Sequence, residues 1–172
     1  MASRHTCRVP GLLLGLAATL VLIVPFQAQA DSNEGGLTGF IEAYRVITGD
    51  DGTEQLLPAE KARPRDIIEY KLMYENTSST SLQNITITDP IPSGTSYIAE
   101  TAHLPQDGLI QFSIDQGKSY QAWPVKVLVV TEDGEEVLRN AAVEEVTHIR
   151  WTLEEDIDPD GGVVVSYRAC VK

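Results

Sequence analysis

The stretch from Pro64 to Ile98 constrains the fold most, because its side chains alternate in character with a period of two. One set of alternate positions is apolar or aromatic and consists of Ile68, Tyr70, Leu72 and Tyr74. The intervening positions are mostly charged. Successive side chains of a β-strand point to opposite faces of a sheet. The pattern therefore predicts a strand with one buried face and one face in water.

The segment after this strand predicts a turn and a second strand. The polar run 76–81 is typical of a turn. Ile85 and Ile87 then point to one side, with polar residues between and around them. Pro90 and Pro92 lack the backbone N–H that a central strand needs, so strand pairing is expected to stop or to change sheets there.

The rest of the chain repeats this organisation. Other short strands are predicted at 37–47, 54–57, 95–99, 109–114, 125–131, 136–138, 146–153 and 163–171, and most are separated by glycine- or aspartate-rich turns. No convincing amphipathic helix is present. About eight or nine short strands predict an all-β fold, an antiparallel β-sandwich. The prolines and the long connection 99–109 favour Greek-key crossings.

The first thirty residues are predicted to be a cleavable signal peptide. A basic start precedes the apolar run 11–24, and Ala28-Gln29-Ala30 fits the small-x-small cleavage rule. A retained anchor is the alternative, but the run is short of the ~20 apolar residues that span a bilayer. We expect a flexible lead-in at 31–36 and a single sandwich domain at 37–172. The mature chain would be periplasmic, on the cell surface or secreted, without a transmembrane segment.

Charge and cysteine content exclude several classes of function. The formal net charge is −12, and cleavage of the signal removes Arg4 and Arg8, which makes the mature chain more acidic. A chain with this negative charge repels the phosphates of nucleic acids, so a nucleic-acid partner is not expected. Cys7 leaves with the signal and Cys170 remains, on the last predicted strand. An inert thiol and an intermolecular disulfide both stay open for Cys170.

Two motifs resemble a known family. The first is Arg65-Asp66-Ile67-Ile68-Glu69-Tyr70, followed by Tyr74-Glu75-Asn76-Thr77 and then by the run from Asn84 to Thr95, which contains Asp89-Pro90-Ile91-Pro92-Ser93-Gly94. The second is Ile149-Arg150-Trp151 followed by Asp158-Pro159-Asp160-Gly161. The chain resembles the domain of unknown function eleven family over about Gly39 to Lys172. Arg65 stands where that family has a glycine. The chain also holds one copy, where that family is often repeated.

The resemblance implies an immunoglobulin-like sandwich of exported bacterial proteins, with no agreed activity and no catalytic residues. From the residues themselves, we interpret Trp151 as a core anchor between the sheets. We expect Asp89 and Asn76 to accept backbone N–H bonds at strand ends.

A search for catalytic chemistry finds little. Only His103 and His148 remain in the mature chain, and no Gly-x-Ser-x-Gly elbow or phosphate-binding glycine loop is present. One cysteine and two scattered histidines do not supply a zinc site. The chain is therefore predicted not to be an enzyme and to need no cofactor.

Ligand binding remains an alternative. Asp156, Asp158 and Asp160, with glycine next, begin like a calcium loop, but Tyr167 stands where a bidentate glutamate belongs. A hairpin turn explains the same residues. Tyr120 and Trp123 are the candidates for a sugar platform.

Two functions are compatible with the sequence. The first is a structural or protein-interaction module of the bacterial cell envelope, which binds an envelope or surface protein through an edge strand. The second is a calcium- or glycan-binding module that uses loops at one end of the sandwich.

Overall fold

The computed structural model describes residues 36–172. The predicted signal peptide at 1–30 and all but the last residue of the lead-in at 31–36 lie outside the described residues. Within 36–172, no helix is long and apolar enough to cross a membrane.

The described chain forms ten strands and one turn of 3-10 helix, η1. Their bounds are β1 Leu37–Thr48, β2 Glu54–Pro58, β3 Ile67–Asn76, β4 Thr86–Pro90, β5 Thr95–Tyr97, β6 Gly108–Ser113, β7 Lys126–Val130, β8 Glu136–Asn140, η1 Val143–Glu145, β9 His148–Leu153 and β10 Gly162–Val171. The all-β prediction is confirmed, with ten strands where eight or nine were expected.

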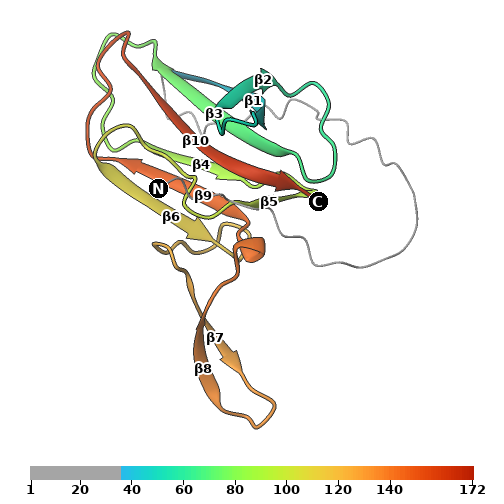
Figure 1. Cartoon of the computed structure of the whole chain (residues 1–172). Helices are drawn as coiled ribbons and strands as arrows, with labels where there is room; N and C mark the ends of the chain where they lie inside the picture. The colour runs from blue at the N-terminus through green and yellow to red at the C-terminus, as the bar shows by residue number, and fades with distance from the viewer. Residues whose placement is uncertain (1–35) are drawn as a thin grey trace.

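Two antiparallel sheets make the body of the molecule. One has the order β2-β1-β3-β10-β5 and the other the order β4-β9-β6. In Figure 1 the two sheets lie one over the other, and the C-terminal strand β10 runs beside β3. Strands distant in sequence are neighbours in both sheets, and the chain passes from one sheet to the other between β3, β4 and β5. This is the predicted sandwich with crossing connections.

The core lies between the inner faces of the two sheets. From β3 it takes the four predicted residues Ile68, Tyr70, Leu72 and Tyr74, and from β10 it takes Val163, Val165, Tyr167, Ala169 and Val171. The register places Tyr70 opposite Tyr167 and Leu72 opposite Val165. The other sheet contributes Ile87, Phe112, Ile149, Trp151 and Leu153. The period-two pattern therefore identified the buried face of both long central strands.

Trp151 lies where the two layers meet. Its side chain is fully buried, and its ring centroid is 6.1 Å from that of Tyr167. The Tyr167 ring is in turn stacked on Tyr70 at 5.1 Å. The interpretation of Trp151 as a core anchor between the sheets is confirmed.

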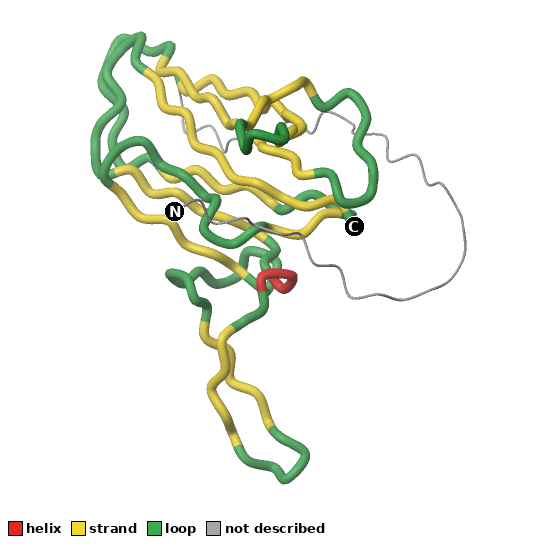
Figure 2. The backbone as a smooth tube through the Cα atoms, viewed as in Figure 1, coloured by secondary structure: helices red, strands yellow, loops and turns green. Residues whose placement is uncertain are grey.

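One predicted pair of strands forms outside the sandwich. Segments 125–131 and 136–138 become β7 and β8, which pair only with each other as a two-stranded hairpin. Figure 2 shows this hairpin standing clear of both sheets, with loop segments and the helical turn η1 at its base. The sequence had placed these segments within the sandwich domain.

We expect Leu72→Ala to lower the free energy of unfolding by about 2–5 kcal/mol, because it leaves a cavity in a fully buried site. Urea denaturation measures this change. Leu109→Ala is the matched control, since Leu109 is 47% exposed on β6 and its truncation is expected to change stability by about 0.5 kcal/mol or less. Equal losses in the two variants would contradict the described core.

Candidate interaction surface

The predicted calcium residues lie in the turn between β9 and β10. The carboxylate of Asp156 accepts a hydrogen bond from Gln83 at 2.8 Å, and that of Asp158 accepts one from Ser81 at 2.6 Å. Asp160 has a left-handed backbone, with φ of 60°. Two of the three carboxylates thus tie this turn to the segment before β4. Across residues 36–172, no group of three or more acidic, histidine or cysteine side chains is placed to hold a metal ion.

The two predicted sugar-platform aromatics are engaged within the chain. The guanidinium of Arg150 lies 3.5 Å from the ring centroid of Tyr120. Trp123 packs edge-on against Phe112, at 5.6 Å, and against Tyr97, at 6.4 Å. One face of Tyr120 is therefore covered by a cation and the Trp123 ring is part of an aromatic cluster. Calcium and glycan binding stay predictions.

The two histidines lie on different segments. His103 pairs through its backbone with Ser166 of β10. His148 begins β9, and its ring nitrogen Nδ1 lies 3.1 Å from the Thr147 hydroxyl. Partial burial lowers the pKa of His148, and the charge of Asp115 opposes that effect. Cys170, the other residue singled out, is buried on β10.

The β7–β8 hairpin is the feature that sequence reasoning did not single out. Its register pairs Leu128 with Leu138 and Val129 with Val137. Because side chains alternate along a strand, the leucine pair lies on one face of the hairpin and the valine pair on the other. Both faces of the hairpin are therefore apolar along its middle.

Most of these side chains lie in solvent, whereas Val129 is half-buried. Leu128 is 59% exposed, Val130 68%, Val137 42% and Leu138 62%. Fully burying a leucine or valine stabilises a protein by about 1.5–3 kcal/mol, and these positions gain little of that from the fold. Apolar side chains gathered on one protruding element mark a surface for interaction. The sequence signal was present: 127–130 is unbroken by polar residues, so it has no preferred inner face.

Contacts at the base hold the hairpin to the body. Val125 and Ala141 are buried, and the Ala141 N–H donates to the Val125 carbonyl at 2.8 Å. Arg139 donates two 2.7 Å hydrogen bonds to the carboxylate of Glu145 in η1, and that carboxylate also accepts the Ala142 N–H. Arg139 is the main cause that lowers the pKa of Glu145 to about 2. The base is thus fixed, while the distal part is held by its own ladder.

The tip of the hairpin is acidic. Between the two strands the chain reads Thr131-Glu132-Asp133-Gly134-Glu135, and Glu136 opens β8. The turn is closed by the Thr131 N–H donating to the Glu135 carbonyl at 2.9 Å, and Gly134 supplies the positive φ of 81° that the turn requires. Apolar faces and an acidic end therefore occur together on one projecting element.

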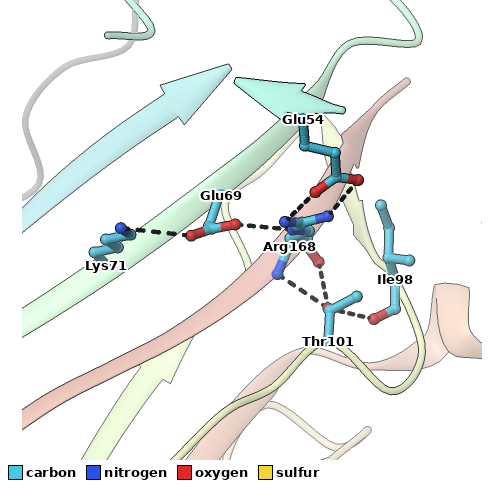
Figure 3. Close-up of polar contacts among 6 residues, drawn as sticks. All are labelled: Glu54, Glu69, Lys71, Ile98, Thr101 and Arg168. Atoms are coloured by element: carbon cyan, nitrogen blue, oxygen red, sulfur yellow. Dashed lines mark hydrogen bonds and ion pairs between the residues drawn. The ribbon is translucent and has the colours of Figure 1, made fainter. Parts of the chain in front are cut away.

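The outer face of the five-stranded sheet carries an ion-pair network (Figure 3). Arg168 on β10 binds Glu69 on β3 and Glu54 on β2, both at 2.8 Å. The backbone N–H of Arg168 also donates to the Thr101 hydroxyl at 3.0 Å, and that hydroxyl donates to the Ile98 carbonyl. These contacts join three strands and the loop after β5. They stabilise the five-stranded sheet and involve no residue of the β7–β8 hairpin.

Asp89 is a carboxylate within the core. It is 4% exposed and accepts a 2.7 Å hydrogen bond from the Tyr167 hydroxyl of the opposite sheet. The expectation that Asp89 accepts backbone N–H bonds at its strand end was wrong, because its position on β4 is an inward-facing one. Asn76 does cap its turn, accepting the Ser78 N–H at 2.9 Å and donating to the Ile157 carbonyl.

Comparison with known proteins adds no relative. No protein-family model, no curated protein and no solved structure matches this chain.

Burial raises the pKa of Asp89 from 3.8 to about 6, against the opposing effect of the Tyr167 hydrogen bond. The folded state therefore binds more protons than the unfolded state between about pH 4 and 6. We expect the contribution of Asp89 to stability to rise by about 3 kcal/mol as pH falls through this window.

Denaturation of the wild type and of Asp89→Asn from pH 4 to 7.5 measures this contribution as the difference between the two curves. Other carboxylates cancel in the difference, including Asp115 and Glu145, whose pKa values are lowered. A difference that stays flat between pH 4 and 6 would contradict the buried, raised-pKa state of Asp89.

Proposed function

We propose that this chain is an exported, non-enzymatic β-sandwich module with a structural or protein-interaction role in the bacterial cell envelope. The observation that carries the proposal is the β7–β8 hairpin, which projects from the sandwich (Figure 1) and keeps Leu128, Val130 and Leu138 in solvent. A fixed base and a protruding element with apolar faces suit docking.

The sequence supports the remaining parts of the proposal. Export rests on the predicted signal at residues 1–30. The bacterial envelope rests on the resemblance to the domain of unknown function eleven family. The interaction role accounts for exposed apolar side chains that the core of the sandwich does not use.

Site-specific crosslinking in the native cells tests this function. A photo-crosslinking amino acid is placed at position 128 or 138, on the exposed leucine face of the hairpin. We expect both positions to give the same product with one envelope protein, identified by mass spectrometry, because both face the same docked partner.

Position 109 is the control. Leu109 is 47% exposed but is flanked across the sheet by Thr152 and Thr86, so it lacks apolar neighbours in its row. Products equally abundant from 109, or no protein product from 128 and 138, would contradict an interaction role for the hairpin. A cytoplasmic location of the processed chain would contradict the envelope assignment.

A further inference from the structure

The outermost strands of the described chain differ in how open their edges are. In an antiparallel pair, the N–H and C=O groups of alternate residues point toward the partner strand, and those of the residues between point away. The outward groups are free to pair with an added strand unless a proline, a side chain or another segment occupies them. The register and the backbone hydrogen bonds decide which residues these are.

The edges of the two main sheets are blunted. On β2 and β4 the outward sets include Pro58 and Pro90, which have no N–H, because the neighbouring Ala59 and Ile91 make the inward bonds. β5 has only three residues. On β6 the backbone of Phe112 is already paired with Gln121. Each of these edges is thus interrupted by a proline, by its short length or by an existing backbone pair.

The two edges of the hairpin are not equivalent. Inward bonds join residues 125 with 141 and 131 with 135, so the even-numbered residues of β7 and β8 point outward. On β7 the side chain of Gln121 accepts the outward N–H of Lys126 and donates to its carbonyl. On β8 the Asn140 carbonyl accepts from Arg139. Leu128 and Val130 therefore carry the open part of the β7 edge, and Glu136 and Leu138 carry that of the β8 edge. Of these four residues Glu136 alone is charged, so β8 is the edge that favours a basic segment.

The side chains beside this open edge define what it fits. Leu138 lies on the exposed leucine face, with Leu128 next to it, and Val137 lies on the opposite face. A strand added along β8 would place its side chains directly opposite these residues, where apolar pairs are favourable. The residue opposite Glu136 is favoured to be lysine or arginine, because opposite charges pair across strands and like charges repel.

Charge favours a basic partner. The tip of the hairpin carries Glu132, Asp133, Glu135 and Glu136, on a chain of net charge −12. At the base, Arg139 is bound to Glu145 and the Lys126 ammonium donates to the Asn140 side chain. A basic segment gains from the same field, both in docking and in its rate of association.

Resting on the proposed interaction role, we infer that the open edge of β8 binds an extended segment of a partner protein by strand addition. That segment carries lysine or arginine next to apolar residues, and it pairs with the backbone of Glu136 and Leu138. β8 is then the central strand of a three-stranded sheet. The segment covers the open edge of β8, and its apolar side chains pack beside Leu138 and Val137.

A displayed library of random peptides, selected on the purified chain, tests this inference. We expect enriched peptides to combine apolar residues with lysine or arginine and to bind more weakly as salt rises. Leu138→Pro removes an outward N–H that the hairpin itself does not use, so it is expected to weaken the enriched peptides about tenfold or more.

Leu128→Pro is the matched control, since it removes the equivalent outward N–H and leucine from the β7 edge. It is expected to keep binding within about threefold of the wild type. Circular dichroism and the thermal midpoint establish that both variants keep the fold. Glu136→Lys, which leaves the backbone pattern intact, is expected to replace lysine and arginine by acidic residues in the enriched peptides.

Four results would overturn the inference. They are an absence of enriched peptides, enriched peptides without lysine or arginine, equal losses in the two proline variants, and a dimer in sedimentation that Leu138→Pro dissociates. Crosslinking to an envelope protein from positions 128 and 138 together with any of these results would leave the proposed function standing and remove only strand addition at β8.

Discussion

The pairing of β3 with β10 is the constraint on which the rest of the structure depends. One register sets both faces of this ladder at once, because a slip by one residue would turn every inward side chain outward. In the observed register Tyr70 stacks on Tyr167 inside the sandwich, and Glu69 lies opposite Arg168 on the outer face. The ion-pair network (Figure 3) and the aromatic core are therefore two consequences of the same alignment.

Tyr167 extends this constraint to the second sheet. Its hydroxyl reaches Asp89 on β4, and its ring lies beside Trp151 on β9. A buried carboxylate costs free energy unless its partner is correctly placed, so an Asp89 without Tyr167 would be penalised. The same burial raises the pKa of Tyr70 to about 12, with a further contribution from the charge of Asp89. The Asp89–Tyr167 hydrogen bond thus disfavours other placements of the two sheets. Above pH 6 the buried charge of Asp89 reduces the stability of the fold.

The sequence predicted those parts of the fold in which one face of a strand is buried. Alternation identified the inner faces of β3, β9 and β10 correctly, because burial on one side forces that pattern. Asp89 was misread, since a polar residue beside a proline is more often a turn residue than a core residue, and its partner Tyr167 lies 78 positions away. No local pattern encodes such a contact.

The hairpin shows a different limit of sequence reasoning. Its strands were predicted, but its place outside the sandwich was not, because 127–130 is equally apolar on both faces and therefore reads like a buried strand. Only the three-dimensional arrangement distinguishes a strand covered on two sides from one such as β7, in which Val127 and Val129 are half-buried and Leu128 and Val130 are exposed. The exposed residues Leu128 and Val130 consequently belong to the run 127–130, whose sequence pattern is typical of a buried strand.

An exposed apolar hairpin also has to avoid pairing with copies of itself. Edge strands are protected in natural proteins by prolines, by short length and by charge. In this chain Pro58 and Pro90 protect the sheets, while the hairpin relies on its acidic tip and on the side chain of Gln121. Proline on β8 would close the edge to every strand, whereas acidic residues add to the net charge of −12 by which whole copies of this chain repel one another, and they still admit a basic segment. The proposed binding of a basic segment is compatible with protection by charge, and it would not be compatible with a proline at this edge.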